Sequence, residues 1–169
     1  MTDAGDDYSR SMGGQALAAR LRRISERLDR DGTRLYAEHD VVFEQRWYGI
    51  LRQLIARGPM SVGEIATALR ISHASVSEAR RSMEKAGIVS SFPAPEDRRK
   101  RTLHLTPRGE ALVAHLGPLW AAFNKAAEEL NEEAGNVVAL LDRLDDALDR
   151  RSMYERILDK AENGSLDET

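Results

Sequence analysis

The fold of this chain is decided by one stretch, which reads Ser61-Val-Gly-Glu-Ile-Ala-Thr-Ala-Leu-Arg-Ile-Ser-His-Ala-Ser-Val-Ser-Glu-Ala-Arg-Arg-Ser-Met-Glu-Lys-Ala-Gly87. Ser61 is a favourable N-cap for a short amphipathic helix. Ile71 lies in the turn that follows, and Ser72 is placed to cap a second helix that Gly87 ends. Two short helices joined by a tight turn predict a helix-turn-helix.

The second of these helices is expected to present a polar face. Helical spacing points Val76, Ala79 and Met83 inward, and it leaves short polar side chains exposed near the helix start. Such side chains suit base edges in a major groove, whereas Ser72 is expected to act mainly as the cap. The predicted DNA contacts from this helix, which we place at residues 73–86, are Ser72, His73, Ser75, Ser77 and Arg81.

A basic hairpin is predicted directly after this helix. Residues 88–92 and 102–105 each show the alternation of a strand, and residues 93–101 between them contain four consecutive cations. A hairpin with a basic tip in this position is a wing, which lies on the DNA backbone or in a minor groove. The predicted contacts from the wing are Arg98, Arg99 and Lys100.

The helix and the hairpin together carry a family pattern. The chain has Met83-Glu-Lys-Ala-Gly-Ile-Val89, then Asp97-Arg-Arg99, then Leu103-His-Leu-Thr-Pro-Arg-Gly109. In residue types and spacing this resembles the multiple-antibiotic-resistance regulator (MarR) family of winged helix-turn-helix transcription factors. The resemblance implies a mainly α fold with a small β-hairpin wing and with N- and C-terminal dimerisation helices. It also implies that Asp97 holds the wing tip rather than contacting DNA.

Three positions depart from the family pattern. Glu78 stands where a basic or neutral residue is common, so it would oppose a phosphate. Arg80 replaces an apolar residue, which implies a rotated helix or a side chain that reaches toward the DNA backbone. Ser91, with Phe92, replaces a frequently basic pair at the base of the wing. We expect these changes to affect the operator sequence and the affinity rather than the fold.

Pattern and punctuation divide the chain into five parts. Residues 1–14 are expected to be a disordered tail, and residues 15–42 a dimerisation helix and its connector, continuous through Asp31-Gly32. Residues 43–109 form the winged helix-turn-helix, whose first helix is predicted from about Phe43 to Arg57 with Ile55 on its apolar face. Residues 110–163 hold C-terminal dimerisation helices, the last predicted as one helix from about Asn136 to Ala161. Residues 164–169 are a tail.

The terminal helices carry apolar stripes that need cover. The positions are Leu17, Leu21, Ile24, Leu28 and Leu35 near the N-terminus, and Val137, Leu140, Leu141, Leu144, Leu148, Ile157 and Leu158 near the C-terminus. An amphipathic helix must bury such a face. The alternative is that these helices pack on their own domain. With the resemblance, the stripes predict a homodimer that presents two recognition helices to a pseudo-palindromic DNA duplex.

MarR-like proteins often bind small aromatic ligands between the dimerisation helices and the DNA-binding lobe. The residues that could line such a site here are Tyr36, His39, Arg46, Trp47, His115 and Trp120. Each also has a plainer interpretation, because the tryptophans lie on core faces and a lone histidine is more often a surface or core residue. A small aromatic effector is therefore a possible partner, and its binding would change the spacing of the recognition helices.

Composition narrows the function classes further. The net charge is −3, but residues 70–108 hold nine Lys and Arg against four Asp and Glu, a net charge of +5. This asymmetry fits one face that meets phosphates. The chain lacks cysteine, a membrane-spanning run and a signal-peptide core, which favours a cytoplasmic protein. Arginine outnumbers lysine, as in GC-rich bacteria.

Catalysis has little support in the sequence. There is no glycine-rich phosphate loop, nucleophile elbow or zinc-enzyme motif, and His39, Asp40, His104 and His115 lack metal-ligand spacing. We therefore expect no enzyme activity, cofactor or metal. The favoured interpretation is a homodimeric DNA-binding regulator, and a repressor rather than an activator. Two alternatives remain open: an architectural protein that binds DNA without an operator, and a protein-interaction module that kept the fold.

Overall fold

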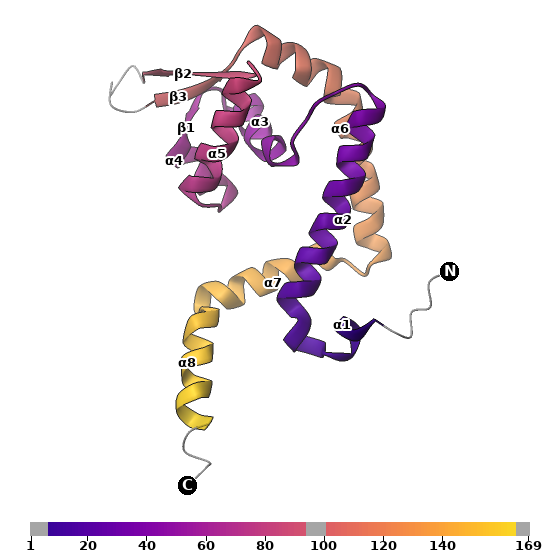
Figure 1. The fold of residues 1–169 in the computed structure, drawn as a ribbon, viewed down its shortest axis with the longest axis vertical. Coiled ribbons are helices and arrows are strands. Elements are labelled where there is room, and N and C mark those ends of the chain that lie inside the picture. Colours follow the sequence, from indigo (N-terminus) through magenta and orange to yellow (C-terminus); the bar gives the residue numbers. More distant parts are fainter. Residues whose placement is uncertain (1–6, 94–100, 165–169) are drawn as a thin grey trace. The chain divides into compact units, whose positions relative to one another are not determined.

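A computed structural model describes residues 7–93 and 101–164 of the chain. The chain divides into two compact units, residues 1–114 and residues 115–169, and each is described by itself. Figure 1 labels the helices and strands of both units. No helix in the two described ranges is both long and apolar enough to cross a membrane.

The first unit begins with helical structure earlier than predicted. Within the expected tail, α1 (Tyr8–Ser11) is capped by Asp7, whose carboxylate accepts from the Ser9 N–H at 3.0 Å, and η2 (Gly13–Ala16) follows. The Asp7 cap explains why helical structure begins here, because its carboxylate satisfies a backbone N–H of the first turn. The prediction of a tail rested only on the polar, glycine-containing composition of this segment. The long helix α2 (Leu17–Glu38) is continuous through Gly32, as predicted.

The next helix, α3 (Gln45–Arg57), begins two residues later than predicted and ends at Gly58, whose φ is +77°. Phe43 lies before the helix, yet it is buried between the Tyr36 and Trp47 rings. The predicted apolar face was wrong at Ile55, which is 42% exposed. The core side of α3 is narrower and consists of Trp47, Ile50, Leu51 and Leu54.

The two helices of the helix-turn-helix have the predicted caps, and the second ends at Lys85, one residue before the predicted end. Helix α4 (Val62–Leu69) begins with a capping box, in which Ser61 and Glu64 each bond to the other's backbone N–H. Helix α5 (His73–Lys85) is capped by Ser72, and the chain leaves it through Gly87 with φ +72°. The side chains where these helices pack are fully or almost fully buried: Ile65, Ala66, Val76, Ala79 and Met83.

The wing belongs to a three-stranded antiparallel sheet of order β1-β3-β2, made by β1 (Met60–Ser61), β2 (Val89–Pro93) and β3 (Arg101–Leu105). The hairpin strands were predicted, but β1 was not. In the central strand, Leu103 is opposite Met60 on one side and Ser91 on the other. Leu103 is completely buried, so the wing is anchored by its base to the core of the domain.

Helix α6 (Pro107–Glu133) starts as predicted at Thr106 and Pro107. The Thr106 hydroxyl donates to the Gly87 carbonyl at 2.6 Å and accepts from the Gly109 N–H at 3.0 Å. A Cβ at Gly109 would lie 2.1 Å from the Ile88 carbonyl oxygen, so only glycine permits this approach. These contacts tie the end of the recognition helix to the start of α6.

The second unit ends in two helices where one was predicted. Helix α7 (Val137–Arg150) and helix α8 (Met153–Gly164) are separated by Arg151, whose backbone is extended at φ −159° and ψ 117°. Ser152 then accepts from the Glu155 N–H at 3.2 Å, while the Glu155 carboxylate accepts from the Ser152 N–H at 2.7 Å. This capping box starts a new helix, which overrides the apolar repeat that runs across the break.

Candidate nucleic-acid interface

Helix α5 presents the polar face that its sequence predicts. His73, Ser75, Glu78 and Arg81 are exposed, whereas Ser77 is half-buried. The residues that point inward, Val76, Ala79 and Met83, are at most 2% exposed. The helix is therefore fixed by its buried side and free to meet a partner with the other.

The first turn of α5 is held by serine side chains. The Ser72 hydroxyl accepts from the Ser75 N–H at 3.1 Å and also lies 2.8 Å from the Ser75 hydroxyl. The cap predicted for Ser72 is confirmed. Because the two hydroxyls already bond to each other, any contact that Ser75 makes with a base or phosphate shares or replaces this bond.

Two polar contacts lie between α5 and α3. The Trp47 indole N–H donates to the Ser82 hydroxyl at 2.7 Å, and Ser82 in turn donates to the Ala79 carbonyl at 2.9 Å. On the exposed side, Arg46 Nη1 lies 2.5 Å from Glu78 Oε1. Arg46 also contacts Glu44 through its Nε at 2.6 Å. The position of the recognition helix therefore depends on the N-terminal end of α3.

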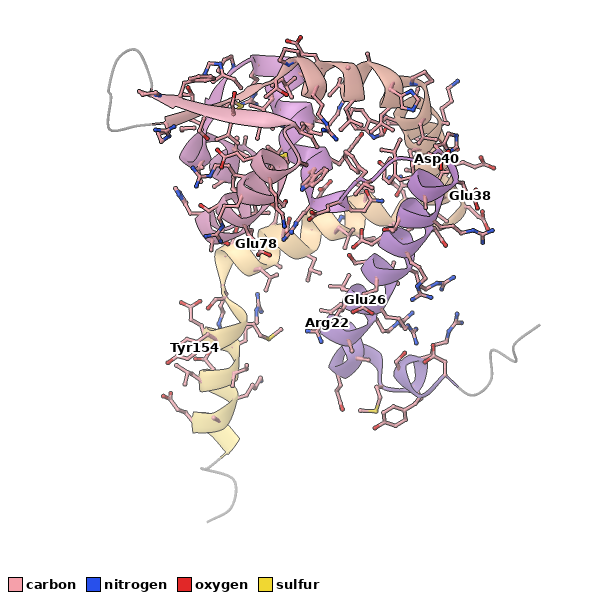
Figure 2. The ribbon with its side chains drawn as sticks, turned by 45° about the horizontal axis from the view of Figure 1, so that its top comes forward. Arg22, Glu26, Glu38, Asp40, Glu78 and Tyr154 are labelled. Atoms are coloured by element: carbon pink, nitrogen blue, oxygen red, sulfur yellow. The ribbon has the colours of Figure 1, made fainter. Side chains whose placement is uncertain are left out.

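The acidic residue at position 78 is thus paired rather than isolated. The hydrogen bond to Glu78, followed by that to Glu44, raises the pKa of the Arg46 guanidinium. No local pattern reveals this pair, because its members are 32 residues apart and belong to different helices. Figure 2 labels Glu78 on the recognition helix.

The other two departures from the family pattern are also explained by neighbours. Arg80 is half-buried, and its Nε lies 4.0 Å from the Glu84 carboxylate one turn along the helix. The Ser91 hydroxyl donates a short hydrogen bond to the same carboxylate. Glu84 therefore joins helix α5 to strand β2, whereas the buried Arg80 Nε makes no hydrogen bond among the described residues.

The base of the wing is ordered by side chains of its strands. Arg101 Nη2 donates to the Ser91 carbonyl at 2.5 Å, and Thr102 Oγ1 lies 2.9 Å from His104 Nε2. The Phe92 and His104 rings pack edge to face with their centroids 5.2 Å apart. Four residues named for the wing tip, Asp97, Arg98, Arg99 and Lys100, lie outside the described residues.

The residues predicted to bind an effector fall in different surroundings. In the first unit, Tyr36 and Trp47 are each 2% exposed and both pack on Phe43, which is not among the six residues predicted to bind an effector. His39 is exposed, with its Nδ1 at 2.9 Å from the Leu35 carbonyl. Arg46 is in the ion pairs described above. In the second unit, His115 is exposed and Trp120 is buried.

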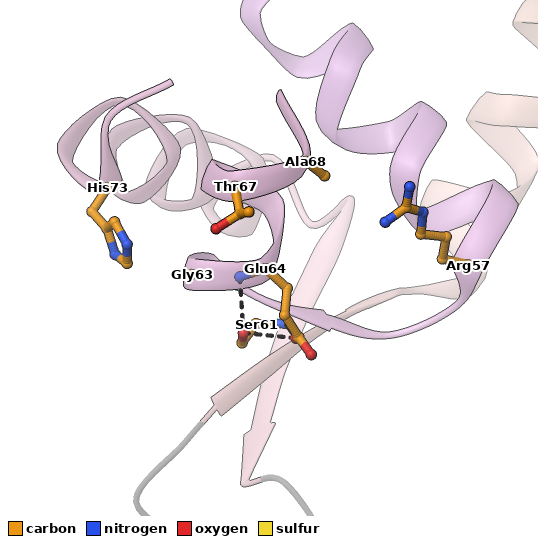
Figure 3. A pocket seen from close by; sticks show the side chains of 7 residues that line it. All are labelled: Arg57, Ser61, Gly63, Glu64, Thr67, Ala68 and His73. Carbon is orange, nitrogen blue, oxygen red and sulfur yellow. Dashed lines mark hydrogen bonds between the residues drawn. The ribbon is translucent and has the colours of Figure 1, made fainter. Parts of the chain in front are cut away.

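Two open depressions on the first unit have linings that include none of these six residues. The larger, of about 520 Å³, is shown in Figure 3 beside the capping box of α4, and it is lined by Arg57, Ser61, Gly63, Glu64, Thr67, Ala68 and His73. The smaller lies at the base of the sheet near Leu54, Pro59 and His104. Over the described residues, no group of three or more His, Cys, Asp or Glu side chains is placed to hold a metal ion.

Comparison with known proteins gives the same domain. The model of the MarR family matches residues 45–100, which span α3, the helix-turn-helix and β2. A protein of Thauera aromatica, named as a transcriptional regulatory protein for the hcr operon, is 30% identical over 100 residues. That alignment covers 57% of this chain and 60% of the relative, so the match spans less than two thirds of that protein.

Solved structures extend the likeness in fold. A structure of BpsR from Bordetella bronchiseptica, whose DNA binding is regulated by 6-hydroxynicotinic acid, is 24% identical with a TM-score of 0.62, over 76% of this chain and 92% of that chain. The DNA complex of MepR from S. aureus is 21% identical with a TM-score of 0.63, over 78% of this chain and 97% of that one. At these identities the likeness concerns the fold alone.

Proposed function

We propose that the protein is a homodimeric regulator that binds a pseudo-palindromic operator. The premise is that its winged helix-turn-helix belongs to the MarR family of transcriptional regulators. Members of this family are regulators rather than enzymes. The observation that carries the proposal is helix α5, which has a fully buried apolar side, a serine cap and an exposed polar face. A rigid helix of this kind enters a major groove with its first turns against base edges.

The contacts are divided between the helix and the wing. His73, Ser75, Ser77 and Arg81 meet bases or phosphates in the major groove, and Ser72 reaches a phosphate only from its position as the cap. Arg98, Arg99 and Lys100 at the wing tip contact the backbone or a minor groove. The buried base of the wing at Leu103 supports this division, because it fixes the two strands that carry the tip.

Dimerisation is supported by apolar side chains that the single chain leaves exposed. In α2 these are Leu17, Leu21, Ile24 and Leu28, each between 38% and 52% exposed. In α7 and α8 they include Leu140, Leu141, Ile157 and Leu158, each between 40% and 59% exposed. A second copy would cover both stripes and set the separation of two recognition helices.

Regulation follows from the same geometry. A dimer bound across a promoter blocks polymerase without further contacts, so we assign repression. Among the residues predicted to bind the effector, Tyr36 and Trp47 both pack on Phe43, and Trp47 is hydrogen-bonded to the recognition helix. A small aromatic ligand that shifts these rings would shift α5 and release one of the two half-sites.

An architectural DNA-binding protein is the second candidate. A protein-interaction module is the third, and two observations favour it. The net charge of the chain is −3, and the exposed face of α5 carries a carboxylate at Glu78. The three differ in how binding depends on sequence and salt.

A titration separates them. The protein is mixed with its own promoter region and with a scrambled duplex at several salt concentrations. An operator-specific regulator prefers the promoter by on the order of 10³-fold or more. An architectural protein binds both duplexes alike with a steep salt dependence, and an interaction module binds neither. Arg99→Ala should weaken binding to every sequence and flatten the salt dependence, since it removes a phosphate contact.

A further inference from the structure

Glu78 is an unusual residue for a helix surface that meets DNA. It is 62% exposed, and with Arg81 one turn on it lies opposite the buried residues Val76, Ala79 and Met83. A carboxylate in that position repels phosphates, yet in a major groove it has a specific partner. Aspartate and glutamate accept a hydrogen bond from the N4 amino group of cytosine.

Arg46 offsets the repulsion that the Glu78 carboxylate would exert on DNA phosphates. Its Nη1 holds Glu78 Oε1 at 2.5 Å, which fixes the direction of the carboxylate and places a positive charge beside it. Within the described residues, no other partner of Glu78 is recorded, so its second oxygen is left for a ligand. Arg46 is in turn held by Glu44, with Nη2 at 2.5 Å from Oε2, so it approaches Glu78 from a fixed direction.

The pair is not needed to join the two helices. Ion pairs between exposed side chains contribute little to stability because both partners are hydrated and screened. The same two helices are already joined by the Trp47–Ser82 hydrogen bond and by buried side chains such as Ile50. What the pair does supply is an oriented carboxylate on the outer face of the recognition helix.

We propose that Glu78 reads a cytosine in the operator by accepting from its N4 amino group, and that Arg46 is the positioning residue that aims the carboxylate. The inference deepens the proposed function and rests on it, since it requires α5 to lie in a major groove. In this proposal Glu78, which departs from the family pattern by being acidic, helps to determine the operator sequence. The base pair concerned is a C·G pair in each half-site.

The test is a binding selection from a randomised duplex library, read by sequencing, for the full-length protein and the variant Glu78→Gln. Glutamine pairs with the N6 and N7 atoms of adenine, so the variant should change its preference from C·G to A·T at one position of each half-site. The change in relative affinity for the two base pairs should be on the order of 10-fold to 100-fold. Preferences at other positions should stay the same.

Glu38→Gln is the matched control. Glu38 lies on α2, is 54% exposed and pairs with Arg34 at 2.9 Å, so this variant removes the same charge and a similar ion pair away from α5. It should strengthen binding slightly and equally for all sequences. If Glu78→Gln does the same without changing any base preference, Glu78 does not read DNA and the inference is overturned.

Arg46 variants test the positioning role. Arg46→Gln should reduce discrimination at the same base pair while it leaves the other positions unchanged, and Arg46→Lys should restore part of it. A uniform loss of affinity with a flatter salt dependence would instead make Arg46 a phosphate contact and would overturn its assigned role. If the wild-type protein selects no sequence at all, the proposed function itself fails, which distinguishes that outcome from failure of the inference.

Discussion

The winged helix-turn-helix and the two C-terminal helices differ in how far their apolar side chains are buried. In the winged helix-turn-helix, Ile50, Leu51, Ile65, Met83 and Leu103 are completely buried within one chain. Helix α7 has no buried residue, and in α8 the side chain of Ile157 is 59% exposed. The first region completes its core with its own residues, whereas the second holds an apolar stripe that is exposed on the described helices α7 and α8.

The difference has an energetic meaning. Burial of a large aliphatic side chain contributes about 1.5–3 kcal/mol to the free energy of folding relative to its exposure. Each exposed leucine or isoleucine would therefore add stability if a partner covered it. A stripe of several such residues on consecutive turns differs from isolated surface leucines, which are ordinary. The winged helix-turn-helix is therefore expected to fold by its own contacts, whereas the terminal helices are expected to gain stability in the proposed dimer.

The strongest test of this comparison places charges in the uncovered stripe. The double variant Leu141→Glu and Ile157→Glu should turn the dimer into a monomer, because two carboxylates cannot be buried unpaired. Affinity for the operator should then fall by on the order of 10² to 10⁴, since two linked half-site contacts become independent. Analytical ultracentrifugation and operator titration measure the two effects.

The matched control for this variant is Lys125→Gln with Lys160→Gln, which lowers the net charge by the same amount at exposed polar positions. It should remain dimeric. A double-glutamate variant that also stays dimeric would mean that α7 and α8 are not the interface, and the contrast between the two regions would lose its explanation.

A smaller effect is expected from two glycines that face different surroundings. At Gly109 a Cβ would meet the Ile88 carbonyl oxygen at 2.1 Å, whereas at Gly117 it would meet nothing within 4 Å of the single chain. Gly109→Ala should lower the free energy of unfolding by about 1–3 kcal/mol. Gly117→Ala should raise it by about 0.5–1 kcal/mol, since alanine is the better helix former. Thermal and denaturant unfolding of both variants provide the measurement.

The second glycine also sharpens the comparison. If Gly117→Ala weakens the dimer instead of stabilising the helix, a second copy packs closely against α6 at that position. If it stabilises the protein, α6 is open there in the dimer too. The first glycine has no such ambiguity, because the obstruction is backbone of its own chain.

The features that the sequence predicted correctly depend on residues close together in the chain. The caps at Ser61, Ser72 and Thr106 and the exit at Gly87 each involve partners within about four positions or a single backbone conformation. The burial of Val76, Ala79 and Met83 follows from helical periodicity alone. These signals were enough to locate the recognition helix and to place its exposed face.

What the sequence missed depends on distant partners or on two competing signals. Strand β1 is two residues long, and it exists only because Leu103 is opposite Met60. The Arg46–Glu78 pair joins different helices, so no local pattern reveals it. The break before α8 did have a local signal, Ser152 followed three residues later by Glu155, but the apolar repeat that spans it indicated one continuous helix.

The smallest effect compares two capping boxes, one in each region. Ser61 with Glu64 starts α4, and Ser152 with Glu155 starts α8. In both boxes the serine N–H donates to the glutamate carboxylate at 2.7 Å, and the glutamate N–H donates to the serine hydroxyl at 3.2 Å. Ser61→Ala and Ser152→Ala should each cost about 1 kcal/mol. In the first variant the loss should appear as a lower free energy of unfolding of the winged helix-turn-helix. In the second it should appear as a weaker dimer, because the proposed dimer would bury the exposed apolar side chains of α8.

Acid should act on the second box through Glu155. The Ser152 hydroxyl, and then the Ser152 backbone N–H, lower the pKa of the Glu155 carboxyl below its ordinary value of 4.5. A lowered pKa means that the contribution of this group is complete above 4.5 and is lost as the pH falls through the lowered value. NMR titration of the Glu155 carboxyl should show the lowered pKa in the wild-type protein, and a pKa nearer the ordinary value in Ser152→Ala. An unchanged pKa in that variant would mean that the backbone N–H of residue 152, which alanine retains, together with the nearby Arg151 and Arg156, is enough to hold the carboxylate, and the Ser152 hydroxyl would then not be the main cause of the lowered pKa.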